Sequence, residues 1–289
     1  MPSFTDRLSD AADQLDRRDL WMYAAVPLLL AALNWNKIHD VLTDPSDFRI
    51  GLSFALPVPV TDPWSFVSAP TDGVEVAGGA DVVGAAVLAG LLVVQGPLLA
   101  AYLGGLRHRL AGDDIGWTGA LRRYWLRLLG FTVVLLAMNF PPALFVVAGV
   151  VGDAVPILVL LWLVVLVALG YLFYATPYLV VLHDAGLLAA LSRSVSLALW
   201  NETYLRYALA YLGTAIALSI PATLIVTNVP ILGILLGVVG LAPVGLLFDT
   251  TTLLFVADLT DAEGIGYGSG GLGGSVDEDD SEWGSLTRE

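Results

Sequence analysis

The segment Val155–Leu182, with the sequence VPILVLLWLVVLVALGYLFYATPYLVVL, contains no charged residue. A helix needs roughly 20 apolar residues to cross the hydrocarbon core of a bilayer, so this segment is long enough to span a membrane. The whole chain has the same character, because 57% of its 289 residues are hydrophobic and its mean hydropathy is +0.78. Soluble domains contain only about 45–50% apolar residues. We therefore predict an all-α integral membrane protein, a six-helix transmembrane bundle with amphipathic cytoplasmic surface helices.

Apolar runs of similar composition occur throughout the chain. The six predicted spans are Leu20–Trp35, Val82–Leu106, Leu128–Val151, Val155–Leu182, Tyr207–Asn228 and Pro230–Ala257. They form one predicted membrane domain over 20–257, which follows an amphipathic cytoplasmic helix over 1–19 and precedes a disordered acidic cytoplasmic tail over 258–289. A long external loop over 36–81 separates the first two spans.

The basic residues predict how this domain is oriented, since cytoplasmic loops of membrane proteins are enriched in Lys and Arg. With the N-terminus inside, the external side holds only Lys37 and Arg49 of the 13 basic residues. The cytoplasmic side receives Arg7, Arg17, Arg18, Arg107, Arg109, Arg122, Arg123, Arg127, Arg193, Arg206 and Arg288. We therefore predict a multi-pass protein of the cell membrane with both termini in the cytoplasm.

The charge balance points to a habitat rather than to a ligand. The chain has 27 acidic residues against 13 basic ones, Lys37 is its one lysine, and it has no cysteine. Surface carboxylates keep a protein hydrated in concentrated salt, where charge repulsion is screened over a few ångströms. The composition thus indicates a protein of a halophilic archaeon.

Amphipathic segments precede the first, third and fifth predicted spans. Apolar residues recur at helical spacing in Phe4–Leu15, Trp117–Leu128 and Leu188–Leu199, and arginines lie on the opposite faces. Such helices lie in the plane of the lipid headgroups. The candidate headgroup contacts are Arg107, Arg109, Arg122, Arg123, Arg127 and Arg193. The expected partners are membrane lipids and other membrane proteins, with no nucleic acid.

The external loop over 36–81 is rich in proline and acidic residues. Two short apolar stretches, Ser53–Leu56 and Trp64–Val67, have the composition of strands or of segments that enter the membrane interface. We favour an acidic loop in water over a loop that caps a ligand.

Polar residues within apolar spans are candidates for function, because they are costly in lipid. The candidate intramembrane polar site comprises Asp249, Gln95 and Asn139. We expect Asp249 to be a carboxylate at the cytoplasmic boundary, paired with Arg193 or Arg206, in preference to an ion or proton site.

No pattern of catalytic or metal-binding residues is present in the sequence. The three histidines, His39, His108 and His183, have no metal-ligand spacing, and phosphate-loop and nucleophile-elbow motifs are absent. We predict no catalytic residue, no cofactor and no metal, and a protein that is not an enzyme.

The stretch Tyr174–Asn201 has a distinctive order, in which a span ends in Pro177-Tyr178 and His183-Asp184 precede a helix with Arg193-Ser194. It resembles the membrane domain of glycerophosphodiester phosphodiesterase-like proteins and of related multi-pass families of bacteria and archaea. The resemblance covers roughly residues 170–215 and the closing Phe255–Leu259. It implies a membrane domain with cytoplasmic helices. The soluble phosphodiesterase barrel is absent, so hydrolase activity is not implied.

Two function classes follow from these observations. The first is a non-enzymatic membrane protein that organises lipids or partner proteins through the arginine-bearing helices at 117–129 and 187–200. The alternative is a small-solute or ion transporter, or permease, that uses the bundle interior.

Overall fold

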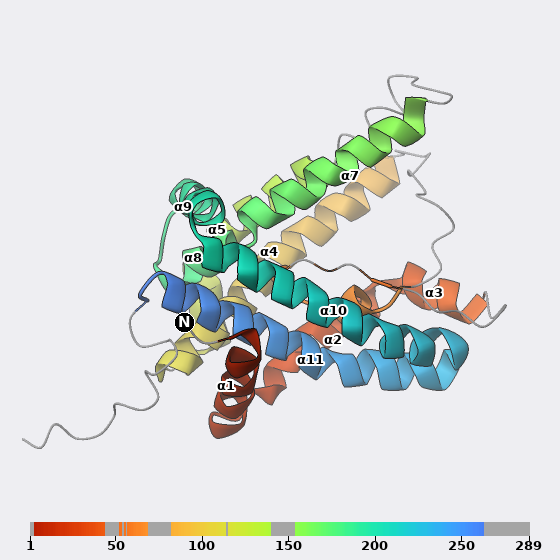
Figure 1. The fold of residues 1–289 in the computed structure, drawn as a ribbon, viewed down its shortest axis with the longest axis horizontal. Helices are drawn as coiled ribbons and strands as arrows, with labels where there is room; N and C mark the ends of the chain where they lie inside the picture. The colour runs from red at the N-terminus through yellow and green to blue at the C-terminus, as the bar shows by residue number, and fades with distance from the viewer. Residues whose placement is uncertain are drawn as a thin grey trace, which may run out of the picture.

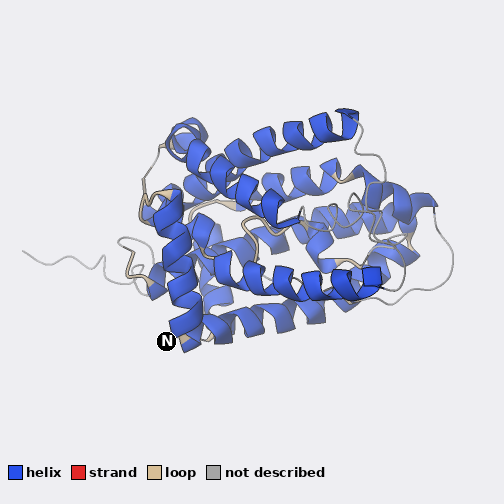
Figure 2. Cartoon of the chain, turned by 90° about the horizontal axis from the view of Figure 1, so that it is seen from above, coloured by secondary structure: helices blue, strands red, loops and turns tan. Residues whose placement is uncertain are grey.

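A computed structural model describes residues 3–43, 52–53, 55, 57–68, 82–113, 115–139 and 154–262. Within these residues the chain consists of helices and loops, without a strand (Figure 2). The helices are α1 (Phe4–Arg17), η1 (Trp21–Ala24), α2 (Ala25–Leu33), α3 (Trp35–Thr43), η2 (Pro63–Phe66), α4 (Val82–Ala111), α5 (Gly116–Asn139), α7 (Ala154–Phe173), α8 (Thr176–Leu182), α9 (Leu187–Trp200), α10 (Glu202–Asn228) and α11 (Pro230–Leu259). The predicted all-α class is confirmed for this part of the chain.

Three helical segments are long and apolar enough to cross a membrane, namely Leu160–Leu182, Glu202–Asn228 and Ile231–Leu259. Their outer faces carry large apolar side chains that protein does not cover, such as Leu161 on α7 and Leu236 on α11. Protein surfaces in water rarely expose such continuous apolar faces. These three segments therefore indicate a multi-pass membrane protein.

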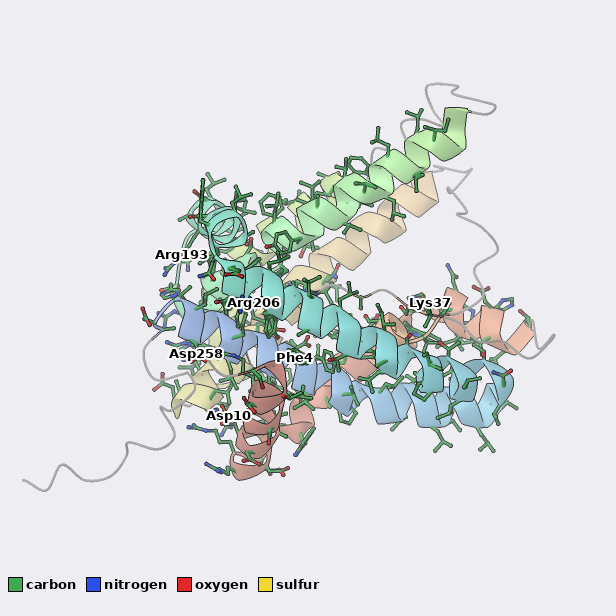
Figure 3. The ribbon with its side chains drawn as sticks, in the orientation of Figure 1. Phe4, Asp10, Lys37, Arg193, Arg206 and Asp258 are labelled. Atoms are coloured by element: carbon green, nitrogen blue, oxygen red, sulfur yellow. The ribbon has the colours of Figure 1, made fainter. Side chains whose placement is uncertain are left out.

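Helices α10 and α11 run side by side, and α4 and α7 diverge from them (Figure 1). Helix α5 packs along α4. The end of the bundle that holds α1 and α9 also holds Arg193, Arg206 and Asp258, whereas Lys37 lies toward the opposite end (Figure 3). The described arginines of α9 and α10 thus lie at the same end as the N-terminus.

The first predicted span, Leu20–Trp35, is not one long helix. The apolar helical stretch Trp21–Leu33 is only about 20 Å long at 1.5 Å per residue, and the helix breaks at Asn34 before α3 begins. A core of about 30 Å is longer than this stretch. The structure therefore does not show a single helix that crosses a membrane over Leu20–Trp35.

The predicted surface helices differ from one another in the structure. The first, α1, packs its buried face of Arg7, Ala11 and Leu15 against α11, and Arg7 forms an ion pair with Asp258. The second is continuous with the third predicted span, because α5 runs without a break from Gly116 to Asn139. The prediction of three separate surface helices is therefore wrong for this segment, while α9 is a separate helix as predicted.

Parts of the predictions lie outside the described residues. These parts are the acidic tail from residue 263 onward, the end of the third predicted span beyond 139, the turn at Gly152 and Asp153, and residues 44–51, 54, 56 and 69–81 of the external loop, which include half of the apolar stretch Ser53–Leu56.

Candidate functional site

The centre of the candidate site is Asp249, which is fully buried on α11. Its carboxyl group accepts hydrogen bonds from the Thr61 backbone N–H at 2.9 and 3.1 Å and from the Thr61 hydroxyl at 2.6 Å. The Tyr102 hydroxyl of α4 donates a third contact at 2.7 Å. One carboxyl group therefore joins α11, α4 and the segment 57–68.

The hydrogen-bonded network extends to α10 and α8. The Thr61 hydroxyl lies 2.8 Å from the Tyr211 hydroxyl of α10, and the Tyr178 hydroxyl of α8 donates to the Val58 carbonyl at 3.0 Å. Tyr102, Tyr178 and Tyr211 are all fully buried. Their apolar rings fill the core while their hydroxyls satisfy polar atoms there.

The segment 57–68 is folded into the bundle, so the predicted loop in water is wrong over these residues. Trp64 is 1% exposed and its indole N–H donates to the Ala31 carbonyl of α2 at 3.0 Å. Phe66 is fully buried and packs edge-on against Phe248 of α11 at 5.3 Å between ring centroids. The apolar run Trp64–Val67 thus contributes to the core of the bundle.

Side chains of the bundle supply the hydrogen bonds that this non-helical backbone lacks. Besides Thr61, the N–H of Ser53 donates to the Ser219 hydroxyl at 3.1 Å, and that of Ser68 to the Thr223 hydroxyl at 3.0 Å. Buried backbone groups must have such partners, and lipid offers none. Thr223 of α10 therefore holds the end of the segment 57–68, and Ser219 of the same helix holds Ser53, four residues before the segment.

Local sequence also shapes the segment. Asp62 accepts hydrogen bonds from the Ser65 N–H and hydroxyl, and Pro63 follows it at the first position of η2. Both are favoured at the start of a helix. On α11, a Cβ at Gly245 would collide with the Thr61 carbonyl, so glycine is required for the close approach of the two backbones.

A pocket of about 670 Å³ adjoins the segment, within the range of about 300–1,000 Å³ that is typical of ligand sites. Val60 and Asp62, on either side of Thr61, line the pocket, whereas Thr61 and Asp249 do not. The remaining walls come from the end of α2, the broken turn around Asn34, and α4 and α5. Besides Val60 and Asp62, the lining residues are Leu29, Leu30, Leu33, Asn34, Trp35, Asn36, Val58, Pro59, Ser65, Val94, Gln95, Leu98, Leu99, Thr132 and Leu135.

The three residues of the predicted intramembrane site have different surroundings. Asp249 is buried in the hydrogen-bonded network, while Gln95 lines the pocket on α4. The side chain of Asn139 lies outside the described residues. Gln95 and Asp249 are thus connected indirectly, through the segment 57–68 and through α4, which carries both Gln95 and Tyr102.

The expected partners of Asp249 are wrong. It lies ten residues before the end of α11, or about 15 Å from that end at 1.5 Å per residue. Its partners are Thr61 and Tyr102 rather than Arg193 or Arg206, and Arg206 instead pairs with Glu202 at 2.7 Å. The carboxyl group therefore makes polar contacts within the described bundle.

Several of the candidate headgroup arginines form ion pairs within the protein. Arg123 contacts Asp184 at 2.9 Å, Arg127 pairs with the same carboxylate, and Arg107 lies 3.5 Å from Asp113. The side chain of Arg18 donates to the backbone carbonyl of Arg109 at 2.7 Å. Arg122 and Arg193 have exposed side chains, and neither forms an ion pair with another described residue.

The Asp184 contacts alter its ionisation. Burial raises the pKa of the Asp184 carboxyl, but hydrogen bonds and charge interactions with Arg123 and Arg127 outweigh this effect and lower the pKa below its usual value. The carboxylate at the turn before α9 therefore stays charged and fixes α5 to that turn.

The described residues contain no group of three or more His, Cys, Asp or Glu side chains that could hold a metal ion. His108 lies 3.3 Å from the Tyr124 hydroxyl and His183 lies 2.8 Å from the Thr260 hydroxyl. Both histidines join neighbouring helices.

Sequence reasoning missed Thr61, Tyr102, Tyr178 and Tyr211, which surround Asp249. Their residue types are common in loops and helices, and no spacing connects them, because they come from four separate elements. The one available signal was an aspartate within an apolar run, since a buried carboxyl group needs hydrogen-bond donors from somewhere in the fold.

Protein-family models, curated proteins and solved structures show no match to this chain. The family resemblance over residues 170–215 therefore stays a prediction. Several residues that carry it make structural contacts, such as the Ser194 hydroxyl, which donates to the Leu172 carbonyl at 2.7 Å, and Asn201, which caps α10.

Proposed function

We propose that this chain is a non-enzymatic multi-pass membrane protein that binds a small solute in the pocket beside the segment 57–68 and carries it as a transporter or permease. The observation that supports this most is non-helical backbone inside the bundle. In membrane proteins such backbone is tolerated where it is buried in protein or lines a cavity. The segment 57–68 does both, through Thr61 on one side and through Val60 and Asp62 on the other.

The broken helix between α2 and α3 supports the same function. Transporters commonly bind substrates where spanning helices are interrupted, because the interruption presents polar backbone and side-chain groups to the ligand. Here Asn34 and its neighbours Trp35 and Asn36 line the pocket at the break. Apolar walls from Leu29 and Leu98 complete a lining suited to an amphipathic solute.

Our proposed topology retains six crossings of the cell membrane with both termini in the cytoplasm. Besides the three long apolar segments, α4 has 30 residues and α5 has 24, enough for a core that needs roughly 20. The first crossing is then made by α2 and α3 together, with the break at Asn34 in the pocket wall.

Binding to the pocket can be tested with two aromatic ions of equal shape and opposite charge, tetraphenylphosphonium and tetraphenylborate. We expect one of them to bind the protein in lipid nanodiscs at one site per chain. Leu98→Trp should weaken that binding at least tenfold, because Leu98 lies in the pocket wall on α4 and the larger side chain would occupy space that the ligand needs. Equilibrium dialysis, with binding to empty nanodiscs subtracted, measures the effect.

Leu163→Trp is the matched control, because Leu163 is an exposed residue of α7 outside the pocket lining. It should leave the affinity unchanged. Binding of neither ion above the empty nanodiscs, or equal binding by the Leu98→Trp variant, would contradict the proposed function.

The second candidate function is organisation of lipids at the cytoplasmic face, and the exposed surface of α9 favours it. Leu188 and Trp200 are 80% and 86% exposed, and Arg193 lies exposed on the same helix. An apolar face flanked by arginine suits the boundary of an anionic membrane.

If the protein organises lipids in this way, the double variant Arg122→Gln with Arg193→Gln should reduce the anionic lipid retained in native mass spectrometry. Arg206→Gln is the control, and equal retention by all forms would argue against this role.

A further inference from the structure

We infer that the solute bound in this pocket is an organic cation, recognised by the Asp62 carboxylate and the Trp35 ring. This inference rests on the proposed function and names its class of substrate. It follows from the distribution of charge around the pocket, from the aromatic residue at its edge and from the apolar character of its walls.

Asp62 is the one charged side chain among the described residues that line the pocket. One oxygen of its carboxylate accepts both hydrogen bonds from Ser65, and the side chain remains partly exposed at the pocket wall. A carboxylate in a partly apolar pocket is poorly hydrated, so a cationic ligand that pairs with it gains more than it would in water.

Among the described residues, Asp62 forms no ion pair with a basic side chain. Lys37 lies on α3, where its ammonium group is 5.9 Å from the centroid of the Trp64 ring (Figure 3). Neither Lys37 nor Trp64 lines the pocket. The amides of Asn34, Asn36 and Gln95 add polar groups to the lining without adding charge.

Trp35 supplies the second element of recognition. It lines the pocket and is 62% exposed, so its ring is available to a ligand. Tryptophan is the aromatic side chain that attracts a cation most strongly, and an aromatic face is a common contact for quaternary ammonium groups. The combination of Trp35, Asp62 and leucine side chains therefore fits a cation with an apolar body.

The paired probes test this inference directly. Tetraphenylphosphonium should bind at least tenfold more tightly than tetraphenylborate. Asp62→Asn should lower the affinity for tetraphenylphosphonium by about tenfold, as expected for loss of a partly desolvated charge pair. Asparagine is also favoured as a helix N-cap, so this variant keeps an oxygen that can accept the bonds from Ser65. Asp40→Asn removes the same charge from α3 outside the pocket lining and is the control.

The possible outcomes distinguish failure of the cation assignment from failure of the proposed solute-binding function. Tighter binding of tetraphenylborate, sensitive to Leu98→Trp, would overturn the cation assignment and leave the solute-binding pocket intact. Equal loss of cation binding in Asp40→Asn and Asp62→Asn would also overturn it, because the effect would then come from general surface charge. Absence of binding by both probes would remove the proposed function itself.

Discussion

Replacing Asp249 with leucine is expected to lower the apparent Tm of the detergent-solubilised protein by about 5 °C or more. Leucine cannot accept hydrogen bonds, so the Thr61 N–H and the Tyr102 hydroxyl lose their acceptor inside the bundle. A buried donor without a partner costs roughly 1–3 kcal/mol, and about 1 kcal/mol shifts Tm by roughly 2–4 °C in a chain of this order of size.

Thr251→Val is the matched control, because Thr251 is equally buried on the same helix and its hydroxyl bonds only to the Leu247 carbonyl one turn earlier. It should change the apparent Tm by much less than Asp249→Leu does. A loss in the control as large as that in Asp249→Leu would show that the effect is general to α11.

A double-mutant cycle tests the contact between Asp249 and Tyr102 itself. Tyr102→Phe alone should be destabilising, because it removes a donor to the carboxyl group. In the Asp249→Leu background the same change should cost little or nothing, since it removes a hydroxyl that has already lost its acceptor. Additive losses would mean that the two residues do not interact.

The apolar helices could be predicted from the sequence because a membrane span is a local property. As predicted, α10 ends at Asn228 and α11 begins at Pro230, where a polar residue and a proline interrupt the apolar run. The surface helix predicted over Trp117–Leu128 and the third predicted span form one helix, α5, since no proline interrupts the chain between Gly116 and Asn139.

The candidate site could not be predicted in the same way, because its contacts join residues far apart in the chain. Asp249 is 188 residues from Thr61 and 147 from Tyr102. The apolar run from Trp64 to Val67 is visible in the sequence, but the acidic composition of the whole loop over 36–81 favoured a loop in water, whereas the run enters the core. A composition taken over a whole loop says little about a short segment that the fold buries.

The first predicted span, Leu20–Trp35, is not shown as one crossing helix, for a related reason. The residues from Leu20 to Trp35 are apolar enough for lipid, but hydropathy does not distinguish contact with lipid from contact with protein. Trp64 packs beside α2 and accounts for part of its apolar character, since its indole N–H reaches the Ala31 carbonyl. The helix ends early, and the break at Asn34 becomes part of the pocket.

Burial of the segment 57–68 inside the bundle supports both the pocket and the Asp249 network, and cysteine labelling measures it most directly. The natural chain has no cysteine, so a single introduced thiol gives an unambiguous signal. Thr61 is fully buried and does not line the pocket, whereas Leu52 of the same predicted loop is 48% exposed.

We expect Thr61→Cys to react with a charged, water-soluble methanethiosulfonate reagent at least a hundredfold more slowly than Leu52→Cys in the folded protein. Both thiols should react at similar rates after unfolding in sodium dodecyl sulfate, which controls for the intrinsic reactivity of each site. Strong protection of Thr61→Cys that is lost on unfolding is the predicted result. Equal labelling of the two variants in the folded protein would contradict a buried segment, and with it the pocket and the network built on it.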